Sequence, residues 1–520
     1  MGKGYERGGV LLKGGGLMSA EANILDRLPP TVEQCSSTGG LSLFDSEGRK
    51  KSQAALLIEI GKKALLFHDS SLNAYAEIEQ DGVKSSMPIR SREFKEYLGH
   101  ELYKLTEKGA SSNAVRDAIS TLEAVAKFDG EMKTVAVRVH QSKDYVAIDL
   151  GCAGRKIIKI NKDGWEVVDS VPVKFIRKKG MTALPLPAET GSIDSLIKYL
   201  NIKPEELPLI YGWVLCALAG VKPYPVLVLQ GEQGTGKSMT SRVIRSLVDP
   251  SAVPLRSPPK DTKDLLVSAA NNHTVILDNL SGISPEMSDC LCRFSTGGGI
   301  DSRALYTDNE QNLIEIQRPV LVNGIDDIAT RPDLAERALL VNLPVIKPSE
   351  RKSESEFWAN FEEDRPAILA GLLNGIVSGF KHRHSIKLES VPRMADVTYW
   401  VTACERDLGL EGQFNAAHEK NQQSAVEAGV ESSPIGSAIM ALMSGHERWS
   451  GNPNELMACL ADIAGDYQSR SRAWPQSAKG LSNTIKRLEP NLRKMGVLVS
   501  RSRGKSGRLY TIERLSTANL

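Results

Sequence analysis

The pattern of apolar and polar positions changes along the chain and predicts several successive parts. Residues 1 to 52 are rich in Gly, Ser and Lys and hold no sustained period, which predicts a mostly flexible arm. Between residues 53 and 205, short strand-like runs alternate with helical stretches, so this part is predicted to be an N-terminal α+β domain. The strand-like runs are residues 64 to 68, 134 to 139, 145 to 150 and 157 to 160.

From residue 206 onward, helix-like patterns are longer and more regular than in the preceding part. Residues 206 to 346 alternate apolar strands with amphipathic helices, which predicts an α/β core with a largely parallel sheet. Its most apolar segment, residues 208 to 221, is shorter than the roughly 20 residues of a bilayer span, so a buried core helix is predicted there. Apolar residues at helical spacing between 365 and 380 open a helical segment, and a polar linker from about 415 completes the part from 347 to 434. Residues 435 to 520 form a C-terminal module.

Composition and charge narrow the functional classes. The 520 residues are 41% hydrophobic and 25% charged, which is typical of globular domains with real cores. Because the net charge is only +2, affinity for nucleic acid must come from local basic clusters. The seven cysteines lack zinc-binding spacing. No secretory signal or membrane span is evident, so a reduced, cytoplasmic protein without a membrane partner is predicted.

The sequence GEQGTGKS follows an apolar run and precedes an amphipathic helix. Its three glycines permit a tight loop whose backbone N–H groups face phosphates at the positive end of that helix. In such a loop Lys237 reaches the β- and γ-phosphates, and Ser238 offers an oxygen to Mg²⁺. The alternative is a chance match, which the flanking strand and helix argue against, so ATP and Mg²⁺ are the predicted cofactors. The predicted nucleotide-binding residues are Gly231, Gly234, Thr235, Gly236, Lys237, Ser238 and Met239.

Two further apolar runs end in polar side chains. The run from 273 to 277 ends at Asp278, which is the predicted carboxylate on the magnesium side, together with Ser238. The next residue is Asn279, where a second acid would activate the attacking water, so the general base stays unassigned. A third run, residues 318 to 322, ends at Asn323, whose amide would orient the water or contact the γ-phosphate. A lone Asn is otherwise a turn residue, and its place at a strand end favours the catalytic interpretation.

The order of these motifs resembles the superfamily-three helicases of viruses, phages and mobile elements, a branch of the AAA+ ATPases. The resemblance rests on GEQGTGKS, VILDN, STGGGIDSRALYTDNEQ, RPVLVNG and DLAERALLVNLP, and covers about residues 206 to 346. More loosely, residues 53 to 205 look like the domain that precedes the core in phage-type members. The resemblance implies an AAA+ P-loop core, ATP bound between the subunits of a ring, usually a hexamer, and translocation on DNA.

The resemblance also implies an arginine that reaches into a neighbour's ATP site. In the family this finger lies just before the last core strand, which places it on Arg337, with Arg331 as the second choice. The alternative is that both arginines only form ion pairs with Asp333 or Glu336.

Between the second and third motifs the family inserts a β-hairpin that carries basic residues to DNA. Residues 303 to 307 and 313 to 317 are predicted to pair around Asp308, Asn309 and Glu310. Because this tip is acidic and phosphates repel carboxylates, the predicted DNA contacts move to Arg303 and Tyr306.

The C-terminal module is strongly basic. From Arg470 to Leu520 there are twelve Lys and Arg against two acids. An amphipathic helix followed by a basic, glycine-bearing hairpin resembles a winged helix. The alternatives are a solvated basic face and a protein-binding winged helix. The predicted DNA contacts are Lys479, Lys486, Arg487, Arg501, Arg503 and Lys505.

Together these features predict an ATP-dependent DNA helicase or translocase in the replication of a phage or mobile element. Its expected partners are single- and double-stranded DNA and further copies of itself in a ring, expected to be hexameric, with a separate primase as a further candidate. Two alternatives stay open: a non-helicase AAA+ initiator or loader, and a nucleotide-gated DNA-binding protein with almost no turnover, which Asn279 favours.

Overall fold

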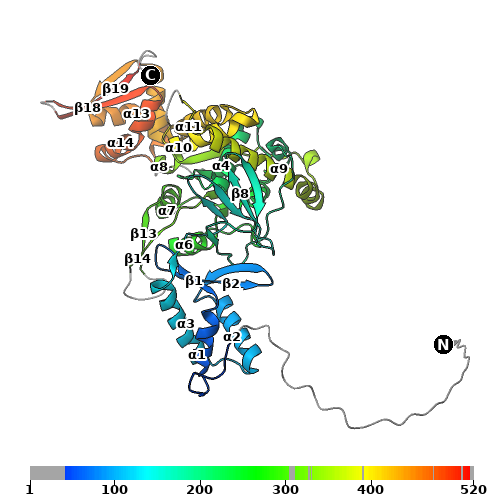
Figure 1. The fold of residues 1–520 in the computed structure, drawn as a ribbon. Helices are drawn as coiled ribbons and strands as arrows, with labels where there is room; N and C mark the ends of the chain where they lie inside the picture. Colours follow the sequence, from blue (N-terminus) through cyan, green and yellow to red (C-terminus); the bar gives the residue numbers. More distant parts are fainter. Residues whose placement is uncertain are drawn as a thin grey trace, which may run out of the picture.

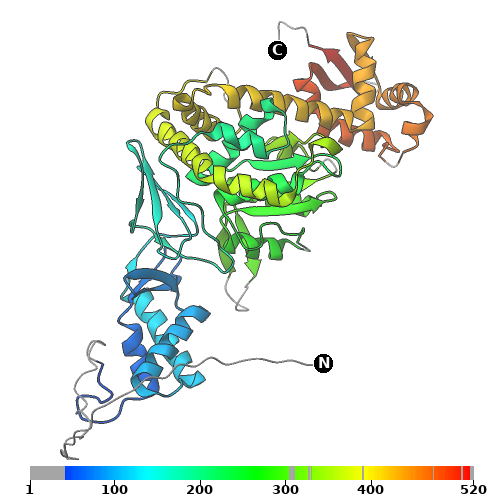
Figure 2. The same ribbon diagram turned by 90° about the vertical axis from the view of Figure 1, so that its right-hand side faces the viewer.

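The computed structural model describes residues 41–259, 261–303, 311–325, 328, 331–388, 392–471, 473–504 and 507–515. Along this length, an N-terminal body, a central body and a C-terminal body follow one another (Figure 1). The N-terminal and C-terminal bodies lie at opposite ends of the central body in both ribbon views (Figure 2). Most of the predicted flexible arm, residues 1–40, lies outside the described residues.

The N-terminal body, residues 53–132, has its own core. Each of its three helices begins after a serine whose hydroxyl accepts a hydrogen bond from a first-turn backbone amide. The helices pack against a four-stranded sheet of order β3-β2-β1-β4. The elements are α1 (Gln53–Gly61), β1 (Leu65–His68), β2 (Ala74–Gln80), β3 (Val83–Pro88), α2 (Arg92–Thr106), α3 (Ser112–Phe128) and β4 (Glu131–Met132).

A four-stranded antiparallel sheet of order β6-β7-β8-β9 follows, which we call the accessory sheet. The apolar side chains of β7 and β8 belong to the same core as those of α4 and α9 in the central body. The indole of Trp165 also donates a hydrogen bond to Asn374 in α9, at 3.0 Å. The accessory sheet therefore packs with the central body, although the sequence grouped it with residues 53 to 205. Its strands are β6 (Val139–Gln141), β7 (Val146–Asp149), β8 (Ile157–Asn161) and β9 (Gly164–Val168), and β5 (Val135–Ala136) pairs with β10 (Lys174–Phe175) beside it.

The central body is built on a four-stranded parallel sheet of order β12-β15-β11-β16. Its strands are buried on both faces, as expected of near-continuous apolar runs in a parallel sheet. The predicted core helix forms α4, in which twelve of thirteen residues are buried. The elements are η1 (Ile193–Tyr199), η2 (Pro204–Glu206), α4 (Leu207–Ala219), β11 (Val226–Gln230), α5 (Lys237–Val248), α6 (Thr262–Asn271), β12 (Val275–Leu280), α7 (Pro285–Thr296), β13 (Gly299–Arg303), β14 (Gln311–Glu315), β15 (Val320–Gly324), α8 (Pro332–Ala335) and β16 (Ala338–Asn342).

The predicted hairpin exists, with a different register. β13 and β14 pair antiparallel from Gly299 opposite Glu315 to Arg303 opposite Gln311. Its first strand therefore ends where the sequence placed the start, because period-2 patterns identify a strand without fixing its partner's alignment. Arg303 is the last residue of β13, and its side chain lies outside the described part, as does Tyr306.

Three helices follow the sheet: α9 (Glu354–His382), α10 (Ala395–Glu405) and α11 (Gln413–Glu431), with the short turns η3 (Pro348–Glu350) and η4 (Arg406–Leu408). The predicted polar linker from about 415 is thus the helix α11. Its polarity has a structural cause, since the amide of Asn421 accepts from the backbone N of Leu340 at 3.0 Å and donates to the oxygen of that residue. The helix covers the exposed edge of β16. Among the described residues, none of the helices combines the length and apolar character that crossing a membrane requires.

The C-terminal body packs three helices on a three-stranded antiparallel sheet of order β17-β19-β18. The predicted basic helix is α14, which buries Leu481, Ile485 and Leu492, and the predicted hairpin is β18 and β19. The elements are α12 (Pro434–Ser444), β17 (Arg448–Gly451), α13 (Pro453–Ser469), α14 (Ala478–Lys494), β18 (Val497–Gly504) and β19 (Gly507–Arg514).

Candidate functional site

The phosphate loop connects β11 to α5, at the carboxyl end of the central sheet. The strand order of the sheet places β11 between β15 and β16, so the loop leaves the sheet at the position where parallel α/β sheets bind ligands. Gly231 allows the loop to pass close to β16, because a Cβ atom there would lie 2.7 Å from the oxygen of Leu343. Gly236 has a φ of 79° directly before the first turn of α5, a conformation that favours glycine.

Lys237 lies folded into the loop and is only 9% exposed. Its ammonium donates to the backbone oxygens of Gly231 and Glu232, at 2.7 and 2.6 Å. Burial lowers the pKa of this ammonium, and the nearby Asp278 carboxylate opposes the shift. The positive charge is thus held at the centre of a glycine loop at a helix N-terminus, which is suited to a polyphosphate.

Asp278, Ser238 and Asn323 meet in one hydrogen-bonded cluster. The same Asp278 oxygen accepts from the Ser238 hydroxyl at 2.8 Å and from the Asn323 amide at 2.7 Å. The Asn323 amide also donates to Ser241 in α5 at 2.8 Å, and Asn323 is buried. One hydroxyl and one carboxylate side by side fit Mg²⁺, which binds proteins through few oxygens and keeps several waters.

Asn279 takes part in this cluster through its backbone. Its N–H donates to the Asn323 side-chain oxygen at 2.8 Å, and its φ is 60°. The pairing of β12 with β15 shifts register between Leu277 and Leu280, at this residue. The left-handed conformation suits Asn, and the side chain of Asn279 is exposed.

A cavity of about 580 Å³ adjoins the loop and was not predicted from the sequence. Its size is within the range of small-molecule sites. The Asn201 amide, at one side of it, donates to the oxygens of Thr235 and Pro344 at 2.9 and 2.6 Å. No local motif marks this cavity, since its walls come from segments over a hundred residues apart. They include Met239 and Thr240 of α5, Leu200 and Asn201 before α4, and Ile346, Arg351 and Phe357 beyond β16.

The two candidate finger arginines have different surroundings. Arg331 is ion-paired to Asp289 and Asp333, at 2.8 and 3.0 Å. Arg337 is half-buried and donates to the backbone oxygen of Asp333 at 2.6 Å, and within the described ranges it has no ion pair. Its own backbone oxygen accepts from the N–H of Val226, the first residue of β11. Arg337 therefore lies at the opposite end of the sheet from its own phosphate loop, roughly 17 Å away at about 3.3 Å per residue.

The predicted DNA contacts of the C-terminal body are mostly exposed. Lys479, Lys486 and Arg487 lie on the outer side of α14. Arg503 is exposed on β18, whereas Arg501 forms an ion pair with Glu489 at 3.0 Å. Lys505 lies outside the described residues.

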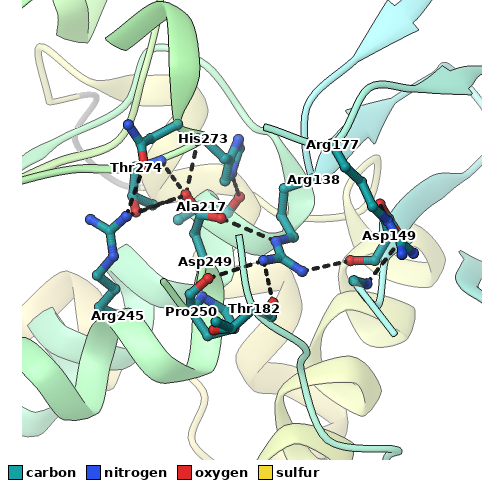
Figure 3. Close-up of polar contacts among 12 residues, drawn as sticks. Arg138, Asp149, Arg177, Thr182, Ala217, Arg245, Asp249, Pro250, His273 and Thr274 are labelled. Atoms are coloured by element: carbon teal, nitrogen blue, oxygen red, sulfur yellow. Dashed lines mark hydrogen bonds and ion pairs between the residues drawn. The ribbon is translucent and has the colours of Figure 1, made fainter. Parts of the chain in front are cut away.

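A buried ionic network joins the accessory sheet to the ATP-site elements (Figure 3). Arg138, which is fully buried, donates to the Asp249 carboxylate at 3.1 Å and to the backbone oxygens of Asp149, Thr182 and Pro250. Asp249 directly follows the last residue of α5. Its carboxylate accepts hydrogen bonds from the N–H groups of His273 and Thr274, just before β12. The Arg138 guanidinium, with the other groups, keeps the pKa of Asp249 low despite its burial. The network fixes the far ends of the two elements that carry Lys237 and Asp278.

Two protein-family models match successive parts of the chain. Residues 193–417 match the family model of the actinomycete integrative conjugative element replication protein, and residues 435–519 match the model of its C-terminal domain, the AICE RepA C-terminal domain. These two regions are those of a mobile-element replication protein. The two matches follow each other in order and together span more than half of the chain. No curated protein matches the sequence.

Several solved structures resemble the chain distantly. One is titled "SCCmec type IV Cch - active helicase", with 12% identity and a TM-score of 0.45 over 87% of this chain and 93% of that chain. Two are apo structures of the NrS-1 C-terminal region, with 10% and 12% identity and a TM-score of 0.39. They cover 89% and 90% of this chain and 99% and 100% of theirs. At this distance the similarity by itself indicates neither an activity nor a partner.

Proposed function

We propose that this replication protein is an ATPase whose turnover drives a ring of identical subunits along DNA, as a helicase of a mobile element. The observation that carries the proposal is the cluster of Ser238, Asp278 and Asn323 at the mouth of a glycine loop. Phosphoryl transfer depends on positioning and on electrostatic stabilisation, and these groups provide both.

Each residue of the cluster has a role in this proposal. Lys237 would leave the oxygens of Gly231 and Glu232 for the β- and γ-phosphates of ATP. Ser238 and Asp278 would hold Mg²⁺, which neutralises charge on the phosphates when bound. Asn323 donates to Asp278 and to Ser241, so it orients the carboxylate, and it would exchange one of these bonds to hold the attacking water or the γ-phosphate. The 580 Å³ cavity beside the loop would take the adenosine.

Assembly into a ring completes the site. Because Arg337 lies at the far end of the sheet from its own loop, a finger role for it would be at the ATP site of another subunit. Arg331 is engaged by two carboxylates and is the weaker candidate. We therefore propose a homo-oligomeric, hexameric ring in which ATP turnover requires neighbouring subunits.

The C-terminal body is proposed to be a winged helix that binds duplex DNA. In support, α14 presents exposed basic residues, and the β18–β19 hairpin follows it as a wing. The β13–β14 hairpin of the central body, with Arg303 at the end of β13 and Tyr306 beyond it, is the proposed single-strand contact.

Replacing Lys486 and Arg487 together with Gln should weaken duplex binding and flatten its salt dependence. Each lost phosphate contact lowers the slope of log K against log salt by about 0.9, so a decrease of about 1.8 is expected. Fluorescence anisotropy with a duplex, measured over a salt series, checks this. The matched control is Arg493→Gln on the same helix, because Arg493 faces Glu489 at 3.8 Å and should change little. An unchanged slope in the double variant would favour a protein-docking role for this face.

Asn279→Asp should leave the basal ATPase rate unchanged or raise it. The backbone N–H of Asn279 makes the contact with Asn323, and Asp tolerates its left-handed conformation nearly as well. Steady-state phosphate release without DNA measures the effect. Asn279→Gly is the matched control, because it keeps the backbone conformation and removes the side chain. Loss of activity in both variants would show that the amide side chain itself is required.

Two experiments separate the helicase proposal from its rivals. Unwinding of forked DNA that depends on ATP distinguishes a helicase from an initiator or loader. Stimulation of the ATPase by single-stranded DNA distinguishes a motor from a nucleotide-gated binding protein with almost no turnover. If the parental protein, shown to be assembled, does not unwind forked DNA, the initiator or loader becomes the better proposal.

A further inference from the structure

A second cavity lies where the N-terminal body meets the accessory sheet, far in sequence from the phosphate loop. It has a volume of about 230 Å³. Its walls come from β2 and β3, from the β7–β8 turn, and from the segment around β10. The volume is below the range of whole small-molecule ligands, which suits a single chemical group of a larger molecule.

The cavity wall is rich in basic side chains, most of which are already paired. Lys174 donates to the Glu77 carboxylate at 2.9 Å. Arg177 makes a two-pronged contact with the Asp149 carboxylate, at 2.8 and 2.6 Å. The third acid of the wall, Asp169, pairs with Lys156 at 2.5 Å, so each carboxylate of the wall already has a cation partner.

Arg155 is a further cation of this wall. It lines the cavity and is half-buried. Within the described residues its side chain has no hydrogen bond and no ion pair. Lys84, on the same wall, is exposed to solvent. A guanidinium that is partly removed from water without an acceptor is costly, and an anion in the cavity would remove that cost.

The electrostatics agree with this geometry. Burial lowers the pKa of Arg155, and the like charge of Arg177 lowers it further, whereas the carboxylates of Asp149 and Glu77 oppose the shift. Burial and the like charge disfavour the charged form, and a bound anion would offset both. The φ of Arg155 is 51°, a conformation uncommon for a residue other than glycine, Asn or Asp, so its placement on this wall is made at a conformational cost.

We propose that this cavity binds a phosphate group of a DNA strand, with Arg155 as its principal contact and Lys84 at the exposed side. A phosphodiester is an anion of the right size, and Arg recognises it through two parallel N–H donors. A free nucleotide offers the same phosphate and, like a strand, would keep its base and sugar outside a cavity of 230 Å³, so binding of free phosphate or AMP distinguishes the two sources. The site is separate from the ATP loop and from the C-terminal body, so it would be an additional DNA contact beyond the proposed ones.

The test compares Arg155→Gln with Lys159→Gln in the full-length chain. Lys159 carries the same charge on the neighbouring strand β8, and neither it nor its partner Glu166, at 3.6 Å, lines the cavity. Binding of a labelled single-stranded oligonucleotide is measured by anisotropy over a salt series. Arg155→Gln should weaken binding by about tenfold, the equivalent of one charged hydrogen-bonded contact, and lower the salt slope by about 0.7. Lys159→Gln should leave both values near the parental ones.

Two further measurements complete the design. The Tm of Arg155→Gln should not fall below that of the parental protein, because the substitution removes no hydrogen bond or ion pair of a described side chain. Its ATPase rate without DNA should also stay unchanged, so failure here is distinguishable from failure of the ATP-site proposal. Equal weakening by both substitutions, or no weakening by Arg155→Gln, would overturn the proposal. Direct binding of inorganic phosphate or AMP, measured by calorimetry, that Arg155→Gln abolishes while strand affinity stays unaffected would assign the cavity to a free phosphate and overturn the strand as its source.

Discussion

Lys237→Ala is expected to abolish ATP turnover and to leave the fold intact. Lys237 supplies the charge at the centre of the loop, and its ammonium contacts only oxygens and a hydroxyl of that loop. Loss of one preorganised electrostatic contact typically lowers kcat by about 10² to 10³, and here the contact is to the transferred group itself. Steady-state phosphate release measures the rate, and circular dichroism with thermal unfolding verifies the fold.

The matched control for Lys237→Ala is Lys263→Ala, which removes an exposed lysine at the start of α6. That variant should hydrolyse ATP at the parental rate. A folded Lys237→Ala protein with near-parental turnover would show that the glycine loop is not the ATP site.

Arg337→Ala is expected to bind ATP normally and to hydrolyse it about 10³-fold more slowly. This factor is at the lower end of the range for arginine fingers. The residue lies at the end of the sheet opposite its own loop, so the substitution should not change nucleotide affinity within one subunit. ATP affinity is measured with a fluorescent analogue and turnover by phosphate release. Arg331→Ala is the comparison, because its ion pairs with Asp289 and Asp333 give it a role within its own subunit.

Mixing experiments test the action between subunits. Neither Arg337→Ala nor Lys237→Ala subunits should be active alone, but a mixed ring contains interfaces with one intact loop and one intact arginine. Such mixtures should recover part of the parental rate, with a maximum at intermediate ratios. If mixtures shown to co-assemble recover nothing, the arginine does not act on a neighbouring subunit. Loss of turnover in Arg331→Ala instead would move the finger to that residue.

The candidate ATP cluster was accessible from sequence because it depends on local order. A glycine loop after an apolar strand, and polar residues at the ends of two further apolar strands, predict a common edge if the strands are parallel. The structure brings Ser238, Asp278 and Asn323 within hydrogen-bond distance at that edge. The roles assigned to them remain proposals. The amphipathic period of α14 and the hairpin after it were likewise visible along the chain.

Other features depended on partners that no local pattern identifies. The polar residues of α11 gave a linker prediction, yet Asn421 bonds the edge of β16, 81 positions away. The accessory sheet shows its apolar faces in the sequence, but only the packing shows that α4 and α9 cover them. The hairpin register also differed, because alternation defines a strand's faces and not its alignment.

By itself, then, the sequence determined the strongly periodic elements such as α4, β11 and α14, the loop that can hold phosphates and the place where basic charge gathers, since these follow from neighbours within a few positions. Only the tertiary structure decided that Arg138 is buried against Asp249, 111 positions away, and that Arg155 lines a cavity without an acid of its own. The physical reason is that burial and pairing of a charge depend on what surrounds it in space. A lone arginine in a sequence looks the same whether it lies in solvent, in a buried ion pair or beside an anion site.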